Sequence, residues 1–232
     1  MEMQLDATML PRLYPIIDRA TLDARGILVV DFARELAEAG VSLMQYRDKV
    51  SGPQEVLRAC GIFEEVFAGV DAHFIMNDRA DLALLMGWGV HLGQKDLSVA
   101  DARSITGCYA TIGLSTHTED QIFTADTTTG QRDRSRVEPW QGDDPSTPDY
   151  IAIGPVFATG TKADAEPVVG LEGVRRARAL TKKPLVAIGG ITHENARSVI
   201  EAGADSVAVI GGLFVEGMSV ADATRDFLAR LR

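Results

Sequence analysis

Residues 73–96 read HFIMNDRADLALLMGWGVHLGQKD, and this stretch decides how the chain folds. Two short apolar runs, His73–Met76 and Gly89–Leu92, have the length and composition of buried strands. Between them, Ala80–Met86 has the apolar spacing of a helix. A strand, a helix and a second strand in this order predict two parallel strands joined by a right-handed crossover.

The same alternation continues on both sides of this stretch. We expect further strands at Tyr14–Ile17, Val41–Tyr46, Ala110–Gly113, Tyr150–Ile153, Leu185–Ile188 and Ser206–Ile210. We expect further helices at Ile27–Ala39, Gln54–Phe67, Glu172–Leu180, Glu194–Ala202 and Val220–Leu231. Ser98 and Thr192 are expected to cap helix starts, and Gly40 and Gly203 to end helices.

Eight strands alternating with about eight helices demand a parallel sheet. In a chain of 232 residues they favour a single (β/α)8 TIM barrel spanning residues 1–232. An open doubly wound sheet is the alternative, and the absence of GxGxxG after the first strand weakens it. The polar stretch at about 126–148 breaks the rhythm and predicts a surface insertion, with a lid role left open by Trp140.

The composition restricts the partners of the chain. A formal net charge of −10 disfavours nucleic acid and anionic membranes. No apolar run approaches the length of a membrane span, and the first residues do not resemble a signal peptide. Cys60 and Cys108 form no CxxC pair, so we expect reduced thiols and a cytoplasmic location. Assembly into a homo-oligomer stays open.

Acidic and basic side chains follow consecutive predicted strands. Asp78 and Asp96 each follow one of the two runs in the opening stretch, so their carboxylates emerge at the same end of the sheet and could share Mg2+. A helix cap for Asp78 and a turn for Asp96 are the alternatives. Arg47 and Lys49 alternate after the second strand and can reach one anion, although a solvated surface is the other reading. If the side chains of Arg47 and Lys49 point into the barrel, that of Gln45 does so too, because alternate residues of a strand share one face.

Hydroxyl groups and glycines follow the later strands. Ser115 follows the fifth strand, and we interpret its hydroxyl as a phosphate donor, not a nucleophile, because no catalytic triad or strained turn surrounds it. The loop 154–162 is rich in small and hydroxyl residues and ends in Lys162, which suits a phosphate. Paired glycines at 189–190 and 211–212 match the phosphate pocket of TIM barrels. The sequence therefore predicts two anion sites for phosphorylated small molecules. A doubly charged group with metal suits the site with Arg47, Lys49 and Lys162, and a monophosphate suits the glycine site.

Taken together, these segments closely resemble the thiamine-phosphate synthase family over almost the whole chain. The resemblance rests on the motifs QYRDK (45–49), NDRADLAL (77–84), GVHLGQKD (89–96), GLSTHT (113–118), DYIAIGPVFATGTK (149–162), VAIGGIT (186–192) and AGADSVAVI (202–210). It implies a TIM barrel that joins a hydroxymethylpyrimidine diphosphate to a hydroxyethylthiazole phosphate. The implied products are thiamine phosphate and diphosphate.

The resemblance also implies a role for each matching residue. The pyrimidine diphosphate would be bound by Gln45, Tyr46, Arg47, Asp48, Lys49, Asn77, Ser115 and Lys162. The thiazole phosphate would be bound by Thr159, Gly160, Thr161, Gly190, Ile210 and Gly211. Mg2+ would be bound by Asp78 and Asp96, and the catalytic groups would be Arg47, Lys49, Lys162 and Ser115. Diphosphate would leave first, with no general base, because the thiazole nitrogen has a free lone pair.

The chain departs from the family pattern at three places. Gly211 stands where the family usually has Ser, Ala158 stands where it usually has Pro, and the stretch from Ser115 to Asp149 is longer than usual. A thiazole tautomerase, a non-catalytic phosphate-binding regulator and a phosphosugar isomerase are rival interpretations. The intact acid pair and the loop ending in Lys162 argue against the first two, and the third needs an acid–base pair that we do not find.

Overall fold

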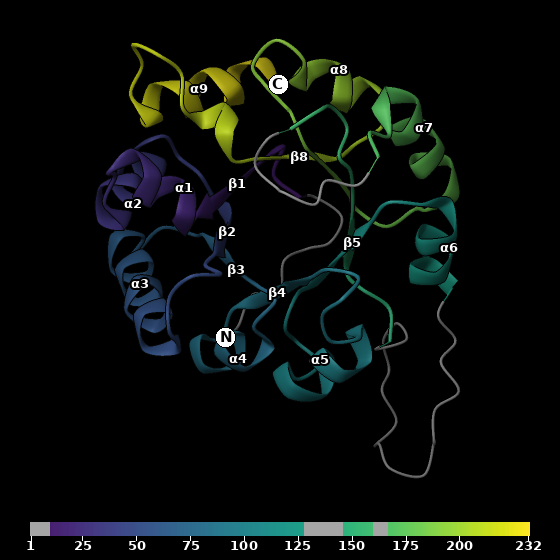
Figure 1. Ribbon diagram of the computed structural model, residues 1–232, viewed down its shortest axis with the longest axis horizontal. Coiled ribbons are helices and arrows are strands. Elements are labelled where there is room, and N and C mark those ends of the chain that lie inside the picture. The colour runs from purple at the N-terminus through teal and green to yellow at the C-terminus, as the bar shows by residue number, and fades with distance from the viewer. Residues whose placement is uncertain (1–9, 128–145, 160–166) are drawn as a thin grey trace.

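The computed structural model describes residues 10–127, 146–159 and 167–232. Eight parallel strands follow one another around a closed barrel, and helices surround it (Figure 1). The predicted (β/α)8 barrel is therefore confirmed. The ring closes where Leu13 of β1 pairs with Val207 of β8. Each strand twists to the right relative to its neighbour, and this accumulated twist allows a parallel sheet of this size to close on itself.

The strands lie close to their predicted positions. Their bounds are β1 Leu13–Asp18, β2 Leu43–Arg47, β3 His73–Asn77, β4 Gly89–Leu92, β5 Ile112–Thr116, β6 Tyr150–Ile153, β7 Leu185–Ile188 and β8 Ser206–Val209. The largest difference is in β5, which runs to Thr116 and not Gly113. Polar side chains were read as the start of a loop there, but the Thr116 hydroxyl is buried and donates to the Ala152 carbonyl at 2.9 Å.

The helices also follow the predictions, with two exceptions. In the described residues they are α1 Arg19–Arg25, α2 Val29–Glu38, α3 Pro53–Val66, α4 Ala80–Met86, α5 Val99–Thr106, α6 Glu119–Thr127, α7 Gly170–Leu180, α8 Ala196–Glu201, the 3-10 turn η1 Gly211–Leu213 and α9 Val220–Arg230. The short helix α1 was not predicted. Thr192 was wrongly predicted as a cap: α8 starts four residues later, and the Asn195 side chain accepts from the Thr192 N–H at 2.8 Å.

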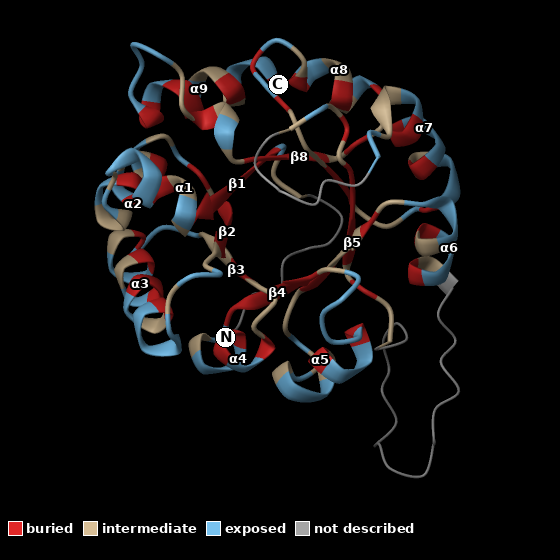
Figure 2. Cartoon of the chain, in the orientation of Figure 1, coloured by how far each residue is buried: buried red, intermediate tan, exposed pale blue. Residues whose placement is uncertain are grey.

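Two hydrophobic cores flank the sheet. The larger one fills the layer between the barrel and the helices, whose inner faces are buried and outer faces exposed (Figure 2). The smaller one fills the barrel interior and includes Tyr14, Leu43, Ile75 and Tyr150. Because side chains alternate along a strand, Tyr46 packs outward against Phe63 of α3 while Gln45 lies inside the barrel.

The predicted insertion at about 126–148 overlaps the end of α6. Asp126 belongs to this helix, and its carboxylate accepts a hydrogen bond from the Thr181 hydroxyl at 2.7 Å. Residues 128–145, including Trp140, lie outside the described residues. Among the residues that the structure does describe, no helix combines the length and the apolar character needed to cross a bilayer.

Candidate active site

A cavity of about 660 Å³ opens at the carboxyl ends of the strands. From the predicted diphosphate group, it is lined by Arg47, Lys49 and Ser115, and from the predicted metal ligands by Asp96. From the predicted thiazole-phosphate group, it is lined by Thr159, Gly190, Ile210 and Gly211. Barrel closure thus brings residues from six strand ends around one cavity, in the position where TIM barrels carry their active sites.

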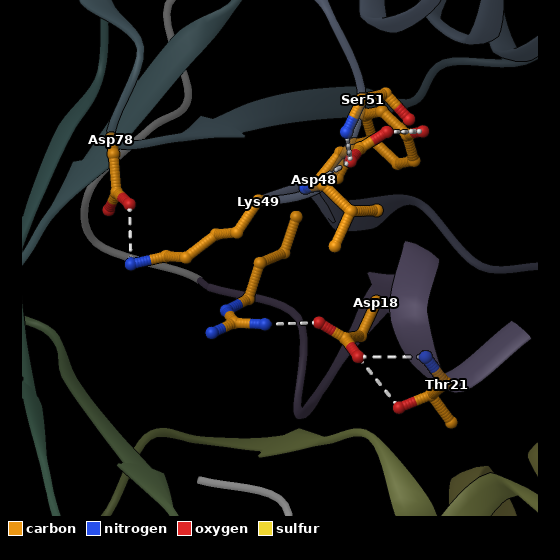
Figure 3. Close-up of polar contacts among 9 residues, drawn as sticks. Asp18, Thr21, Asp48, Lys49, Ser51 and Asp78 are labelled. Carbon is orange, nitrogen blue, oxygen red and sulfur yellow. Dashed lines mark hydrogen bonds and ion pairs between the residues drawn. The ribbon is translucent and has the colours of Figure 1, made fainter. Parts of the chain in front are cut away.

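Arg47 is held by a buried carboxylate that the sequence analysis did not identify. Its guanidinium pairs with Asp18 at the end of the neighbouring strand β1, and Asp18 is only 5% exposed. The other Asp18 oxygen accepts from the Thr21 backbone N–H at 3.0 Å and from its hydroxyl at 2.7 Å (Figure 3). Asp18 therefore caps α1 and fixes the direction of Arg47 with one side chain. The sequence signal that could have identified Asp18 is an acidic residue at a strand end, three residues before Thr21.

Lys49, Asp78 and Asp96 form a second charged cluster beside Arg47. Lys49 Nζ lies 2.9 Å from Asp78 Oδ2 (Figure 3). Asp78 does not cap α4, whose N-terminal residue Arg79 makes no side-chain cap. Asp96 accepts from the Gly93 backbone N–H at 2.7 Å, so it also stabilises the turn after β4. Burial raises the pKa of Asp96, and the adjacent Asp78 carboxyl raises it further.

The crowding of Asp78 and Asp96 fits a divalent cation. Two carboxylates in contact repel each other, and a bound cation would relieve that repulsion. Within the described ranges, no group of three or more His, Cys, Asp or Glu side chains could hold a metal ion. Mg2+ does not require such a group, because it commonly uses one or two carboxylates together with water and substrate phosphate oxygens. The donor set therefore suits Mg2+ shared with a phosphorylated ligand.

Ser115 stands on β5 with its hydroxyl 2.9 Å from His91 Nε2. Its carbonyl accepts from the Gln94 side chain at 2.5 Å. His117 also lines the cavity and contacts the Gly154 carbonyl through Nδ1 at 2.7 Å. Sequence reasoning did not find Gln94 as a site residue and treated His117 as a loop residue, because neither role is visible without the neighbouring strands.

Four predicted diphosphate residues in the described ranges do not line the cavity, namely Gln45, Tyr46, Asp48 and Asn77. Gln45 lies inside the barrel and donates to the Tyr14 hydroxyl. Tyr46 is buried outside the barrel and donates to Asp48 Oδ2 at 2.9 Å. Asp48 Oδ1 accepts from the backbone N–H groups of Val50 and Ser51, at 3.0 and 2.9 Å. Asn77 ends β3 in register with His91. Tyr46 and Asp48 thus shape the turn that carries Lys49.

Backbone groups dominate the other part of the cavity wall. Gly190 has φ +63°, and a Cβ there would lie 2.5 Å from the Ala158 carbonyl oxygen, so glycine lets the loops after β6 and β7 meet. Gly211 begins η1, whose first N–H groups have no partner within the turn. A Cβ at Gly211 would meet nothing within 4 Å. Gly160, Thr161 and Lys162 lie outside the described residues.

Comparison with known proteins shows which family the sequence of this chain matches. A family model described as thiamine monophosphate synthase matches residues 13–213. A thiamine-phosphate synthase from Koribacter versatilis is 45% identical over 210 residues, covering 89% of this chain and 90% of that protein. One from Syntrophomonas wolfei is 37% identical over 202 residues, covering 87% of each.

A solved structure agrees with the sequence comparison. The thiamine phosphate pyrophosphorylase from Pyrococcus furiosus superposes with a TM-score of 0.75 at 30% identity, covering 95% of both chains. The match to the family model, over residues 13–213, runs from the first residue of β1 past β8 and therefore includes every strand end that contributes to the cavity. The chain thus belongs to the thiamine monophosphate synthase family of transferases.

Proposed function

We propose that this protein joins 4-amino-5-hydroxymethyl-2-methylpyrimidine diphosphate to hydroxyethylthiazole phosphate, giving thiamine phosphate and diphosphate in thiamine biosynthesis. The observation that carries the proposal is the unequal wall of the cavity. Arg47, Lys49 and Asp96 line the cavity after β2 and β4, with Asp78 paired to Lys49 beside them, whereas glycine-rich loops form the wall after β7 and β8. These two surfaces suit a highly charged leaving group and a simple monophosphate, respectively.

The charged part of the wall would stabilise the departing diphosphate. Arg47 and Lys49 lie where they can neutralise its oxygens, and the Ser115 hydroxyl can donate to it. We assign Lys162 to the same group because it is the cation of the sequence motif DYIAIGPVFATGTK. Mg2+ held by Asp78 and Asp96 would supply further positive charge to the same oxygens. Gln45 lies deeper in the barrel and is assigned to the pyrimidine.

The glycine-rich part of the wall would bind the thiazole phosphate. The loop after β7 contains Gly190, and the loop after β8 contains Ile210 and Gly211. Backbone N–H groups at such positions bind phosphate without a side-chain cation. Thr159 lies on the same cavity and adds a hydroxyl group, and Gly160 and Thr161 continue that loop in the sequence.

The chemistry requires positioning more than proton transfer. The bond between the pyrimidine methylene carbon and the diphosphate oxygen breaks with its electron pair on oxygen. The aminopyrimidine stabilises the resulting cation, and the thiazole nitrogen lone pair forms the new carbon–nitrogen bond. No general base is needed for this substitution, so leaving-group stabilisation and alignment of the two substrates would account for most of the rate.

An assay with both substrates tests the proposal directly. We expect diphosphate release to require the pyrimidine diphosphate, the thiazole phosphate and Mg2+ together, and thiamine phosphate to appear in equal amount. Folded protein that binds both substrates but releases no diphosphate would contradict the proposal and favour a phosphate-binding regulator. Turnover without added metal, after treatment with a chelator, would contradict the role of Asp78 and Asp96.

A further inference from the structure

A chain of hydrogen bonds crosses the interior of the barrel beneath the cavity. It consists of Gln45, Tyr14, Tyr150, His91 and Ser115, and we call these five residues the interior chain. Gln45 Nε2 donates to the Tyr14 hydroxyl at 3.2 Å, which lies 2.9 Å from the Tyr150 hydroxyl. The Tyr150 hydroxyl lies 2.9 Å from His91 Nδ1, and His91 Nε2 lies 2.9 Å from Ser115 Oγ.

Close packing fixes the members of this chain. His91, Gly113 and Tyr150 are in register on the adjacent strands β4, β5 and β6. A Cβ at Gly113 would lie 2.0 Å from the Tyr150 ring, so the glycine makes the space that the ring occupies. The Tyr150 ring stacks on His91 with centroids 5.6 Å apart and meets Tyr14 edge-on at 6.1 Å. The contacts are therefore set by the barrel and not by mobile side chains.

The donors and acceptors of the interior chain define one direction. Gln45 Nε2 can only donate, so the Tyr14 oxygen accepts from it. If Tyr14 also accepted from Tyr150, its own buried proton would have no acceptor among the described residues, so that proton is directed to Tyr150. The proton of Tyr150 is then directed to His91 Nδ1, which leaves the ring proton on Nε2, facing Ser115. Burial raises the pKa of Tyr14 and of Tyr150 well above the ordinary value, so both hydroxyls keep their protons at working pH.

We infer that the interior chain is a positioning device that commits the Ser115 hydroxyl to donate its proton into the cavity. Ser115 Oγ accepts from His91, so its own proton is directed to an acceptor on the cavity side. Resting on the proposed function, that acceptor is an oxygen of the pyrimidine diphosphate. Gln45 and Ser115, at the two ends of the interior chain, are thereby coupled across the barrel. Tyr14, Tyr150 and His91 act through Ser115 and are positioning residues.

The first test measures the tautomer of His91 and needs no activity. Nitrogen-15 NMR of ring-labelled protein should show the proton on Nε2 of His91. A proton on Nδ1 would overturn the inference, because the chain would then run toward Gln45 and the Ser115 proton would be directed to His91. This measurement stands even if the condensation reaction is not observed, so failure of the proposed function and failure of the inference are distinguishable.

The second test reverses the chain from its far end. In Gln45→Glu, burial raises the pKa of the new carboxyl group, so the variant is measured at increasing pH until this group is ionised. The carboxylate then accepts from Tyr14, so each later link must reverse and the His91 proton should move to Nδ1. Trp88→Phe is the control, since it removes a partly buried hydrogen bond from Trp88 Nε1 to Glu64 outside the barrel and should leave the proton on Nε2. A His91 tautomer unchanged by Gln45→Glu would show that the two ends are not coupled.

The third test measures energetic coupling. Tyr150→Phe should lower kcat about tenfold while the KM for the thiazole phosphate stays unchanged. In a Ser115→Ala background the same substitution should have no further effect on kcat. Equal factors in the two backgrounds would assign Tyr150 a general structural role and overturn the inference. If Tyr150→Phe fails to fold, Tyr14→Phe gives the same comparison one link further from Ser115.

Discussion

Two parts of the cavity wall differ in how they are built. The charged wall contains Arg47, Lys49 and Asp96, and the glycine wall contains Gly190 and Gly211. In the charged wall, Arg47 and Lys49 are long side chains that need partners, and each has an acidic one, Asp18 or Asp78. In the glycine wall, the absence of side chains at Gly190 lets two loops approach each other. Substitutions in the first wall should therefore act on the chemical step, and substitutions in the second should act on binding.

The largest expected effect is that of Arg47→Gln. It removes the cation nearest to Asp18, and we expect kcat to fall by about 10³-fold, as when a preorganised donor to a developing anion is lost. Steady-state kinetics with saturating substrates measure it. The control is Arg79→Gln, because Arg79 pairs with the exposed Asp81 and is not among the described residues that line the cavity. Near-normal turnover in Arg47→Gln would contradict the prediction that substitutions in the charged wall act on the chemical step.

The loss of Arg47 also leaves Asp18 as an uncompensated buried charge. Breaking one partner of such a pair destabilises a protein more than removing both. The double variant Arg47→Gln, Asp18→Asn should therefore recover thermal stability but not kcat. Recovery of kcat together with stability would show that Arg47 supports the fold and not the leaving group.

Asp78→Asn should have the next largest effect. Asp78 has φ +63°, a conformation that Asn tolerates as well as Asp, so the backbone should be preserved. We expect the Mg2+ concentration for half-maximal rate to rise about 100-fold, since a carboxylate ligand is replaced by a neutral amide. Asp81→Asn, three residues further along, is the control and should leave this concentration unchanged. The same Mg2+ dependence in both variants would contradict the metal assignment.

Gly190→Ala tests the glycine wall. The added Cβ would meet the Ala158 carbonyl at 2.5 Å and force the loops after β6 and β7 apart. We expect the KM for the thiazole phosphate to rise about tenfold, with a much smaller change for the pyrimidine diphosphate. Gly217→Ala is matched for backbone strain, because its φ is +78° and a Cβ there would meet nothing within 4 Å. If both variants alter KM equally, strain and not loop contact is responsible.

Gly211→Ser should have the smallest effect, and it is a gain. A Cβ at this position has open space around it, so the hydroxyl can be added without moving the backbone. One further donor to the phosphate should lower the Kd for the thiazole phosphate about threefold. Titration of the phosphate-bearing substrate by calorimetry measures the change. Weaker binding would show that the backbone N–H groups already satisfy the phosphate.

The strand ends were predictable to different degrees. β6 and β7 were predicted to the residue, because each is a short apolar run bounded by Asp, Pro or Gly. β5 was misplaced because Ser115 and Thr116 look like loop residues until His91 and the Ala152 carbonyl are beside them. The helix α1 was missed because its seven residues carry little hydrophobic periodicity.

The sequence by itself determined the alternation of strands and helices, and with it the closed parallel barrel. It also determined that Arg47, Lys49, Asp78 and Asp96 emerge at one end, since strand polarity follows from the order of elements. Only the tertiary structure decided which charges meet. The pairing of Arg47 with Asp18 and the direction of the interior chain depend on contacts between strands that lie far apart in the sequence. No local pattern encodes such contacts, because they form only when the barrel closes.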